Sequence, residues 1–433
     1  MAEWWQLLEI SPVIVKMISE AEKNTVDIQH ALNENTLFNQ AKVLNAFREE
    51  KISDDHFNSS EGYGYGDEGR EKLEALFARV FRGEKALVRP HFVSGTHTLY
   101  TCLRGLLRPG DRLVSVTGEP YDTLSRALRG EKAPKKEKTP PALIESGEGA
   151  LAEWNITFQC LQEKDFLDPE KEIEVNKILQ EPTRVVYIQR SRGYNYYRKA
   201  LTIEEMTELI AKIRAINPQA VIMVDNCYGE FVEKKEPLEA GADIIAGSLI
   251  KNPGGSLAPT GGYVAGKADL ISIISSAASA PGLGQDIGAF VHNKRPYFQG
   301  LFHAPHLVGE ALKGAVLIAA SLRTAGYEVD PAADERRGDI VQAVRLKNWE
   351  ELEIFCRAVQ SFSPINSYVT PVPGVTAGYK DPILMAAGTF VQGSSSEFSA
   401  DGPLREPWAV YIQGGVSYQH VLLGLSAILR DIL

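Results

Sequence analysis

Lys251 lies where a side-chain amine could take part in covalent chemistry. It directly follows the strand-like segment 246–250 and precedes the turn Pro253-Gly254-Gly255. A lysine at a strand end usually faces solvent, so this position alone indicates no function. A lysine amine can nevertheless form a Schiff base with a carbonyl compound, and it can act as a base where its site lowers its pKa.

Asp225 ends a second apolar run, 221–224, and lies 26 residues before Lys251. Since α/β sheets bind ligands at the carboxyl ends of their strands, both side chains are expected at the same edge of one sheet. A buried carboxylate needs a cationic partner or several hydrogen-bond donors. A pyridinium nitrogen would suit Asp225; the alternative is that it caps a helix or turn.

Small residues mark a third segment, Val93-Ser94-Gly95-Thr96-His97-Thr98, between a predicted strand and a predicted helix. Such residues let backbone N–H groups at a helix N-terminus approach a phosphate. Ser248, three residues before Lys251, could add a hydroxyl. An ordinary helix N-cap explains the first segment equally simply. The small-residue loop, the acid at a strand end and the lysine after a strand, in this order, are together much more specific.

This order of motifs resembles the pyridoxal-phosphate (PLP) enzymes of fold type I, the aspartate aminotransferase fold. Four further segments resemble the aluminium-resistance or methionine gamma-lyase-like proteins of the cystathionine beta/gamma-lyase group. They read SSEGYGYGDEGR, VDNCYGEF, GSLIKNPGG followed by APTGGYVAG, and GPLREPWAVYIQGG. The resemblance extends from about Asn35 to the C-terminus.

The resemblance implies a role for each matching residue. Lys251 would hold PLP covalently and Asp225 would keep its ring nitrogen protonated. Tyr121 would stack on the ring and could protonate a leaving thiolate, and Arg405 would bind the substrate carboxylate, with Arg190 and Arg192 as the next candidates. The phosphate would be bound by Ser94, Gly95, Thr96 and Ser248, and by Tyr63 or Tyr65 of a neighbouring subunit.

The chain departs from the lyases of this group at two places. They usually carry Thr directly before the lysine, where this chain has Ile250, and they have a Tyr-x-Arg pair in the N-terminal region, where Tyr65 and Arg70 stand further apart. The resemblance implies β- or γ-elimination from a sulfur amino acid in a homodimer or homotetramer with shared active sites. Transamination, aldol-type cleavage and a cofactor-free stress-response scaffold remain alternatives.

Composition narrows the class of protein. The chain has 433 residues, 44% hydrophobic and 24% charged, with a formal net charge of −10. The net charge argues against a general nucleic-acid binder, which needs a basic surface. The basic stretch 132–138 is interpreted as a solvated loop. The four scattered cysteines predict neither a disulfide framework nor a metal site. We see no signal peptide or membrane span and expect a cytoplasmic protein.

Two glycine patterns that could suggest nucleotide binding are rejected. The segment 261–267 spells G-x-x-x-x-G-K, but Ala268 stands where a phosphate loop needs Ser or Thr, and the segment reads as a strand. The G-x-G-x-G at Gly62 has no preceding strand.

The elements that must position these residues alternate between strand and helix. Such alternation predicts a mostly parallel sheet covered on both faces. Helices are expected over 71–81, 96–107, 121–129, from Thr202 with a capping box to Glu205, 305–324, 349–362 and from 417. Strands are expected over 86–88, 112–116, 156–161, 184–189, 220–224, 243–248, 262–265, 339–346, 385–391 and 408–412.

Three regions follow from this pattern. Residues 1–65 are expected to form a helical segment and arm, 66–300 a large domain that by the resemblance would bind PLP, and 301–433 a smaller α+β domain near which the N-terminal segment packs. Residues 131–150 are expected to be a loop insertion.

Overall fold

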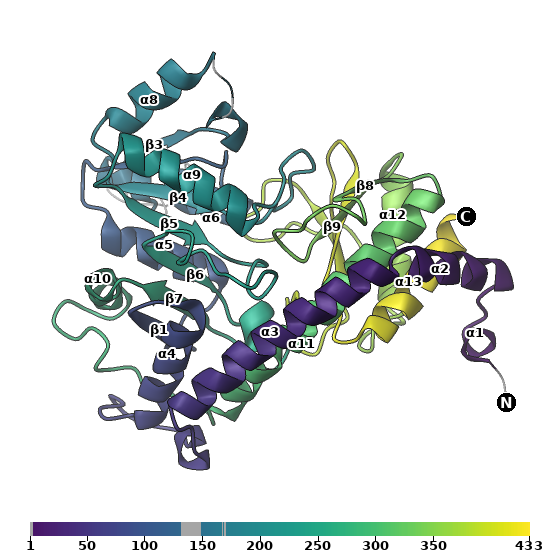
Figure 1. The fold of residues 1–433 in the computed structure, drawn as a ribbon, viewed down its shortest axis with the longest axis horizontal. Helices are drawn as coiled ribbons and strands as arrows, with labels where there is room; N and C mark the ends of the chain where they lie inside the picture. The colour runs from purple at the N-terminus through teal and green to yellow at the C-terminus, as the bar shows by residue number, and fades with distance from the viewer. Residues whose placement is uncertain (1–2, 131–148, 167, 169) are drawn as a thin grey trace, which may run out of the picture.

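The structure, a computed structural model, describes residues 3–130, 149–166, 168 and 170–433. Its larger sheet has seven strands in the order β1-β7-β6-β5-β4-β2-β3 (Figure 1). Strands β2 to β6 pair in parallel, and β7 runs antiparallel to both β6 and β1. The strands are β1 (Lys85–Arg89), β2 (Arg112–Ser115), β3 (Thr157–Cys160), β4 (Val185–Gln189), β5 (Val221–Asp225), β6 (Ile244–Ser248) and β7 (Gly262–Gly266). The predicted mostly parallel sheet is confirmed.

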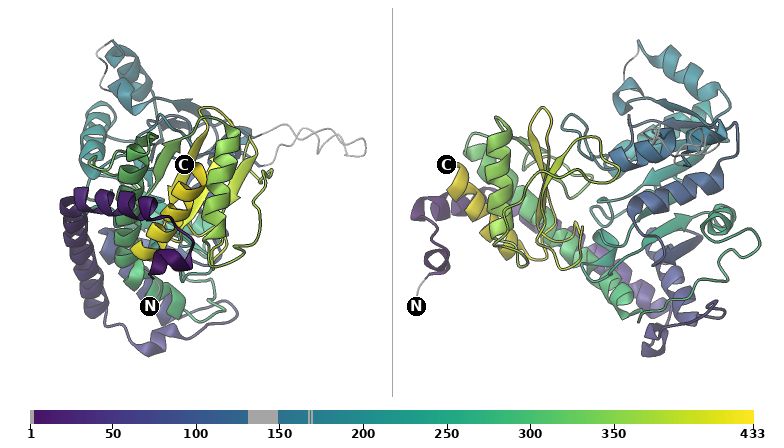
Figure 2. Two further views of the ribbon diagram at one scale, coloured as in Figure 1. Left: turned by 90° about the vertical axis from the view of Figure 1, so that its right-hand side faces the viewer. Right: turned by 180° about the vertical axis from the view of Figure 1, so that it is seen from behind.

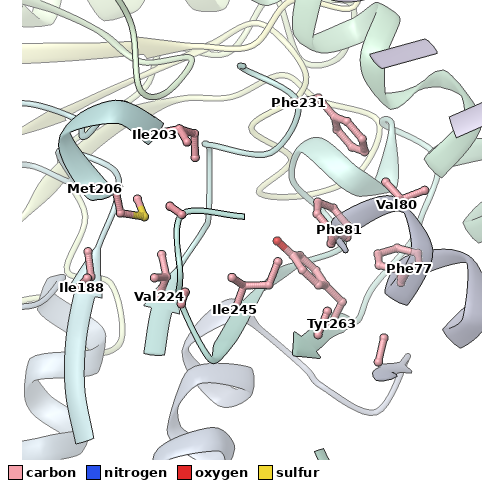
Figure 3. Close-up of a cluster of buried hydrophobic side chains, with 14 of the residues drawn as sticks. Phe77, Val80, Phe81, Ile188, Ile203, Met206, Val224, Phe231, Ile245 and Tyr263 are labelled. Carbon is pink, nitrogen blue, oxygen red and sulfur yellow. The ribbon is translucent and has the colours of Figure 1, made fainter. Parts of the chain in front are cut away.

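Helices cover both faces of this sheet, as the apolar strands require. Along β5, Ile222 and Val224 enter one hydrophobic core, whereas Met223 enters another on the opposite face. Figure 3 shows the first core, in which Phe81 stacks on Tyr263 with ring centroids 5.0 Å apart. The helices of this domain are α4 (Glu68–Phe81), α5 (Gly95–Leu106), α6 (Asp122–Arg129), α8 (Glu172–Gln180), α9 (Ile203–Ile216) and α10 (Ala268–Ala278), with 3₁₀ turns η1 (Asp54–Phe57), η2 (Leu151–Trp154), η3 (Glu163–Phe166) and η4 (Asn252–Gly254).

The C-terminal region forms a second, antiparallel sheet of five strands in the order β10-β11-β12-β9-β8. Helices α12 (Trp349–Ser361) and α13 (Tyr418–Ile432) share a separate hydrophobic core with it. The strands are β8 (Glu328–Asp330), β9 (Gln342–Arg345), β10 (Ile383–Ala386), β11 (Ser399–Pro403) and β12 (Ala409–Gln413). This is the predicted smaller α+β region.

A long helix joins the two regions. Helix α11 (Arg295–Thr324) contributes Leu301, Val308 and Leu312 to the core of the large domain, and Leu317 and Leu322 to the core of the small one. It begins ten residues before the predicted start at residue 305, and Pro305 lies inside it. The expected domain boundary at residue 301 therefore falls within a continuous helix.

The N-terminal helices pack against α11. They are α1 (Trp4–Leu7), α2 (Pro12–Asn24) and α3 (Val26–Glu49). Helix α3 runs alongside α11, while α2 contacts α11 and α13, so that both chain ends lie at the small domain (Figures 1 and 2). Ile14 and Ile18 of α2 are buried in the small-domain core, which confirms the expected packing of the N-terminal segment.

Two predictions about short segments, a capping box and a segment that is no phosphate loop, are confirmed. The capping box is present: the Thr202 hydroxyl accepts a hydrogen bond from the Glu205 N–H, and the Glu205 carboxylate accepts one from the Thr202 N–H. The G-x-x-x-x-G-K segment contains β7 in the interior of the sheet, so it is no phosphate loop. The expected loop at 131–150 lies almost wholly outside the described residues.

Several elements were not predicted. They are α8, α10, β8 and β11. Strand β11 reads SADGP, a composition typical of a turn, yet all five residues are buried. Within the described parts of the chain, no helix is long and apolar enough to cross a membrane.

Candidate active site

Lys251 lies at the carboxyl end of β6, in a turn fixed by close backbone contacts. A Cβ on Gly254 would approach the Leu249 carbonyl oxygen to 1.5 Å, and one on Gly255 would approach the Gly300 carbonyl oxygen of α11 to 2.1 Å. Both positions therefore require glycine. The Pro-Gly-Gly turn thus holds Lys251 between the large sheet and α11.

Ionisable side chains neighbour the Lys251 amine. Its Nζ lies 3.9 Å from the centre of the Tyr228 ring. Burial lowers the pKa of Lys251, but the neighbouring groups of Cys227, Tyr228 and Asp225 outweigh burial and leave the pKa above its ordinary value. The free amine is therefore a cation, and it must lose this proton before it can act as a nucleophile or base.

Asp225 ends the adjacent strand β5 and is 4% exposed. Its Oδ1 accepts a hydrogen bond from the Cys227 N–H and its Oδ2 one from the Tyr187 hydroxyl, both at 3.1 Å. Among the described residues, no side chain forms an ion pair with it within 4.0 Å. Two neutral donors only partly offset the burial of a carboxylate, so the site has room for a cationic ligand atom.

The N-terminus of α5 meets the end of β6 beside Asp225. A Cβ on Gly95 would lie 3.4 Å from the Ser248 Cβ and 3.6 Å from the Cys227 Sγ. The Ser248 hydroxyl is buried and has no hydrogen-bond partner in the described chain. A helix N-terminus beside an unpaired hydroxyl fits a phosphate group.

Ser94 and Thr96, also predicted to bind the phosphate, have partners of their own. The Ser94 hydroxyl accepts a hydrogen bond from the His97 N–H at 3.1 Å and so caps α5, as the simpler interpretation held. The Thr96 hydroxyl contacts the Thr123 hydroxyl of α6. Gly95 and Ser248 are therefore the stronger candidates for binding the phosphate. The backbone N–H groups at the start of α5 could still donate hydrogen bonds to it.

A cavity of about 340 Å³ opens between the domains. Gln189 lines it, and Gln189 pairs with Asp225 across strands β4 and β5. Tyr121 lines the cavity, and its ring lies edge-on to those of Tyr194 and Tyr379, with centroids 5.8 and 5.5 Å apart. The Tyr121 N–H donates to the Gln189 side chain at 2.8 Å. Tyr411 and Arg405 of the small domain complete the wall.

Arg405 reaches this cavity from the small domain. Its guanidinium donates to Asp381 at 2.9 Å and to the Tyr194 carbonyl at 2.8 Å, and it lies 3.8 Å from Asp122. Two acidic neighbours thus compete with a substrate carboxylate for this arginine. Its side chain remains 34% exposed.

Arg190 and Arg192, the two alternative arginines, are less well placed to bind a substrate carboxylate. Arg190 is fully buried and donates to Asn226, Glu233 and two backbone carbonyls. It therefore holds the loops after β4 and β5 in place. Arg192 lines the cavity and forms an ion pair with Asp330 at 2.5 Å.

Tyr63 and Tyr65 lie on the arm and do not join the site in their own chain. They are 72% and 66% exposed, and their rings contact each other with centroids 5.6 Å apart. Arg70 is buried and donates to the carbonyls of Gly64 and Gly288, so it anchors the arm instead of pairing with Tyr65.

Asp401 and Tyr194 were not anticipated from the sequence. The Asp401 carboxyl, on β11, accepts a hydrogen bond from the Tyr194 hydroxyl at 2.8 Å, and burial raises its pKa to about 6. Tyr194 in turn lines the cavity. An acid in a recognised buried strand would have been a signal, but SADGP was not recognised as a strand.

Comparison with known proteins identifies relatives along almost the whole chain. The model of the methionine gamma-lyase family matches residues 14–433. The uncharacterized protein YnbB of Bacillus subtilis is 43% identical over 415 residues, which cover 94% of each chain. A crystal structure of a carbon-sulfur lyase involved in aluminium resistance from Clostridium novyi is 42% identical, with a TM-score of 0.89 and full coverage of both chains.

A more distant structure shares the fold alone. The pyridoxal-5'-phosphate-dependent protein YhfS of Escherichia coli is 18% identical, with a TM-score of 0.58 over 93% of this chain and 97% of that one. This chain therefore shares the α/β fold of that protein.

Proposed function

Because the chain belongs to the methionine gamma-lyase family, we propose that it is a PLP-dependent carbon–sulfur lyase acting on a sulfur-containing amino acid. The observation that carries this proposal is the convergence of three features at one edge of the large sheet. A lysine meets there a carboxylate that forms no ion pair within the described residues and a serine hydroxyl that has no hydrogen-bond partner among them, beside a helix N-terminus.

These features match the three chemical parts of PLP. Lys251 would hold its aldehyde carbon, Asp225 would pair with its ring nitrogen, and Ser248 with the N–H groups from Gly95 onward would bind its phosphate. PLP supplies an electron sink for the carbanion that forms when the α-proton leaves. Asp225 favours this sink because its negative charge keeps the ring nitrogen protonated.

The chain's own residues would then orient the substrate and move protons. Arg405, which lines the cavity, would hold the α-carboxylate and orient the α-proton for removal. The Lys251 amine, in its unprotonated form, would remove that proton. Tyr121 would stack on the cofactor and lie beside the departing sulfur. The products of β- or γ-elimination are a thiol, ammonia and a 2-oxo acid.

An amino-acid panel tests this function. The PLP-loaded protein is incubated with thioether and thiol amino acids and with amino acids that lack sulfur, and thiol and 2-oxo acid are both measured. Release of the two in equal amounts supports the proposal. Formation of 2-oxo acid without thiol would indicate transamination, and a protein that takes up no PLP would contradict the proposal altogether.

Arg405→Lys is expected to raise KM for the amino acid by about 10-fold or more while the PLP spectrum stays unchanged. Lysine keeps the charge but loses the planar fork that binds a carboxylate through two hydrogen bonds. Steady-state kinetics and an absorbance spectrum measure both quantities. Arg345→Lys, at an exposed ion pair with Glu328, is the matched control. An unchanged KM in Arg405→Lys would transfer the role to Arg192.

We further propose that the active site is shared between two chains, with Tyr63 or Tyr65 reaching the phosphate of a partner. The support is their exposure on an arm that Arg70 anchors from within. Mixing Lys251→Ala with a Tyr63→Phe, Tyr65→Phe double variant should restore activity. A mixed dimer has one site with neither lesion, so about a quarter of the wild-type activity is expected for random mixing of equal amounts, provided the tyrosine variant alone is impaired.

The control is each variant incubated alone under the same conditions, with mixed dimers demonstrated by a differential tag. An impaired tyrosine variant that gains nothing on mixing would mean that the tyrosines act within their own chain.

A further inference from the structure

A buried carboxyl group of the small domain binds a tyrosine that lines the cavity between the domains. Asp401 is buried on β11, and its Oδ2 accepts hydrogen bonds from the Tyr194 hydroxyl and from the Gln413 side-chain amide, both at 2.8 Å. No Lys, Arg or His of the described chain lies within ion-pair distance of it. Since both donors are neutral, a negative charge on Asp401 is poorly compensated.

The surroundings of Asp401 favour its protonated form more than those of an ordinary carboxyl. Burial raises the pKa of Asp401 to about 6, although the two hydrogen bonds and the charge of Lys251 lower it. When Lys251 has given up its proton, this last effect disappears and the carboxyl holds its proton more firmly. The other titratable groups near Asp401 are Tyr228, Tyr379 and Cys356, whose pKa values burial raises, so that they are neutral at pH 7.

Tyr194 connects Asp401 with the cavity. Its ring lines the cavity and contacts the ring of Tyr121, its carbonyl accepts from Arg405, and its hydroxyl binds Asp401. A phenol carries one proton and can accept hydrogen bonds as well. While Asp401 is ionised, the phenol proton is directed at its carboxylate. A protonated Asp401 can instead donate to the phenol oxygen, which frees the phenol proton for a group in the cavity.

We propose that Tyr194 is the proton donor to the leaving group, and that Asp401 is the positioning residue that directs this phenol and returns a proton to it. The inference rests on the proposed lyase function. In a β-elimination, the electron pair left when Lys251 takes the α-proton forms the new carbon–carbon double bond. The sulfur departs with the electrons of the broken C–S bond and takes the Tyr194 proton. The phenol oxygen takes the carboxyl proton of Asp401. Solvent later returns a proton to Asp401, while Lys251 releases the α-proton to solvent.

The leaving group provides a test that a purely structural role would not pass. Chloride leaves without a proton, so 3-chloroalanine bypasses the donor, whereas a thiol-releasing amino acid needs it. Tyr194→Phe should lower kcat for the thiol-releasing substrate by on the order of 10²-fold, and kcat for 3-chloroalanine by no more than about threefold. Tyr327→Phe is the matched control, because the Tyr327 hydroxyl donates to Glu351 at 2.7 Å in the small domain, away from the cavity.

Asp401→Asn tests the second half of the proposal. Asp401 must be protonated to serve the donor, so kcat for the thiol-releasing substrate should fall as pH rises through the pKa of Asp401. In Asp401→Asn, kcat should no longer show this fall. Its maximum value should also be about 10-fold lower than in the wild type. Infrared difference spectra of the cofactor-free protein give a readout apart from activity. The protonated carboxyl band that titrates near pH 6 should disappear in Asp401→Asn and persist in Tyr327→Phe.

Three results would overturn the inference while leaving the lyase function intact. Tyr194→Phe could slow the thiol-releasing substrate and 3-chloroalanine equally, or kcat in Asp401→Asn could still fall with rising pH. The third is that Tyr121→Phe, and not Tyr194→Phe, slows the thiol-releasing substrate selectively. A wild-type protein that releases neither thiol nor 2-oxo acid from any substrate would instead reject the proposed function, with the infrared titration still measurable.

Discussion

Lys251→Ala is expected to lose the visible absorption band of bound PLP and to lower turnover by at least on the order of 10³-fold, because the variant lacks both the covalent attachment and the base. The amine lies at 3.9 Å from the Tyr228 ring centre, in a turn that close glycine contacts hold in place. Removing the side chain should therefore leave the backbone unchanged. Absorbance after incubation with PLP and thiol release from the best substrate of the panel measure the two effects.

Lys267→Ala is the matched control. Lys267 follows β7 as Lys251 follows β6, but it is half exposed and forms an ion pair with Asp243 at 2.6 Å. It is also the lysine of the G-x-x-x-x-G-K pattern. The control should retain the band and nearly full activity. If Lys251→Ala kept the band, or if Lys267→Ala lost it, the assignment of the cofactor lysine would be wrong.

Asp225→Ala is expected to weaken PLP binding by about 10- to 100-fold, since a hydrogen bond to a charged group contributes roughly 1.5–3 kcal/mol. Turnover should fall further even at saturating PLP, because the ring nitrogen then loses its proton and the electron sink weakens. Asp225→Glu keeps the charge and should be milder. Titration with PLP followed by absorbance gives the affinity, and kinetics at saturating cofactor isolate the second effect.

Asp243→Asn provides the control for burial alone. Asp243 is another buried acid of the same sheet, but it precedes β6, where it accepts from the Ile222 N–H and pairs with Arg214 and Lys267. It should lower the free energy of unfolding by about 1–3 kcal/mol and leave PLP affinity unchanged. Full activity and affinity in Asp225→Ala would mean that Asp225 only caps the turn at Cys227.

The large domain was predictable from sequence because its strands are buried on both faces. Runs such as 221–224 are then apolar throughout, and strand ends are marked by the first polar residue, which here is Asp225. Lys251 was found in the same way, because it follows an apolar segment that was recognised as a strand. Helix α11 was predicted to start too late because proline normally marks a helix start, whereas Pro305 lies inside this helix.

The small domain's contribution to the site was largely missed. Arg405 was found only through its motif, and Asp401 and Tyr194 were not found at all. Strand β11 contains Ser, Asp, Gly and Pro, residues typical of turns, and tertiary packing between β10 and β12 overrides that preference. The Asp401–Tyr194 contact also joins residues 207 positions apart, a separation that no local pattern reveals.

Helix α11 has a consequence for how this protein folds. One continuous helix supplies Val308 and Leu312 to one hydrophobic core and Leu317 and Leu322 to the other, while Gly300 in its first turns touches the glycine turn after Lys251. Neither core is complete without it, so neither domain contains all the parts of an autonomous folding unit. Unfolding of α11 would expose both hydrophobic cores at once and would free the glycine turn that follows Lys251. We therefore expect α11 to unfold only together with the rest of the protein.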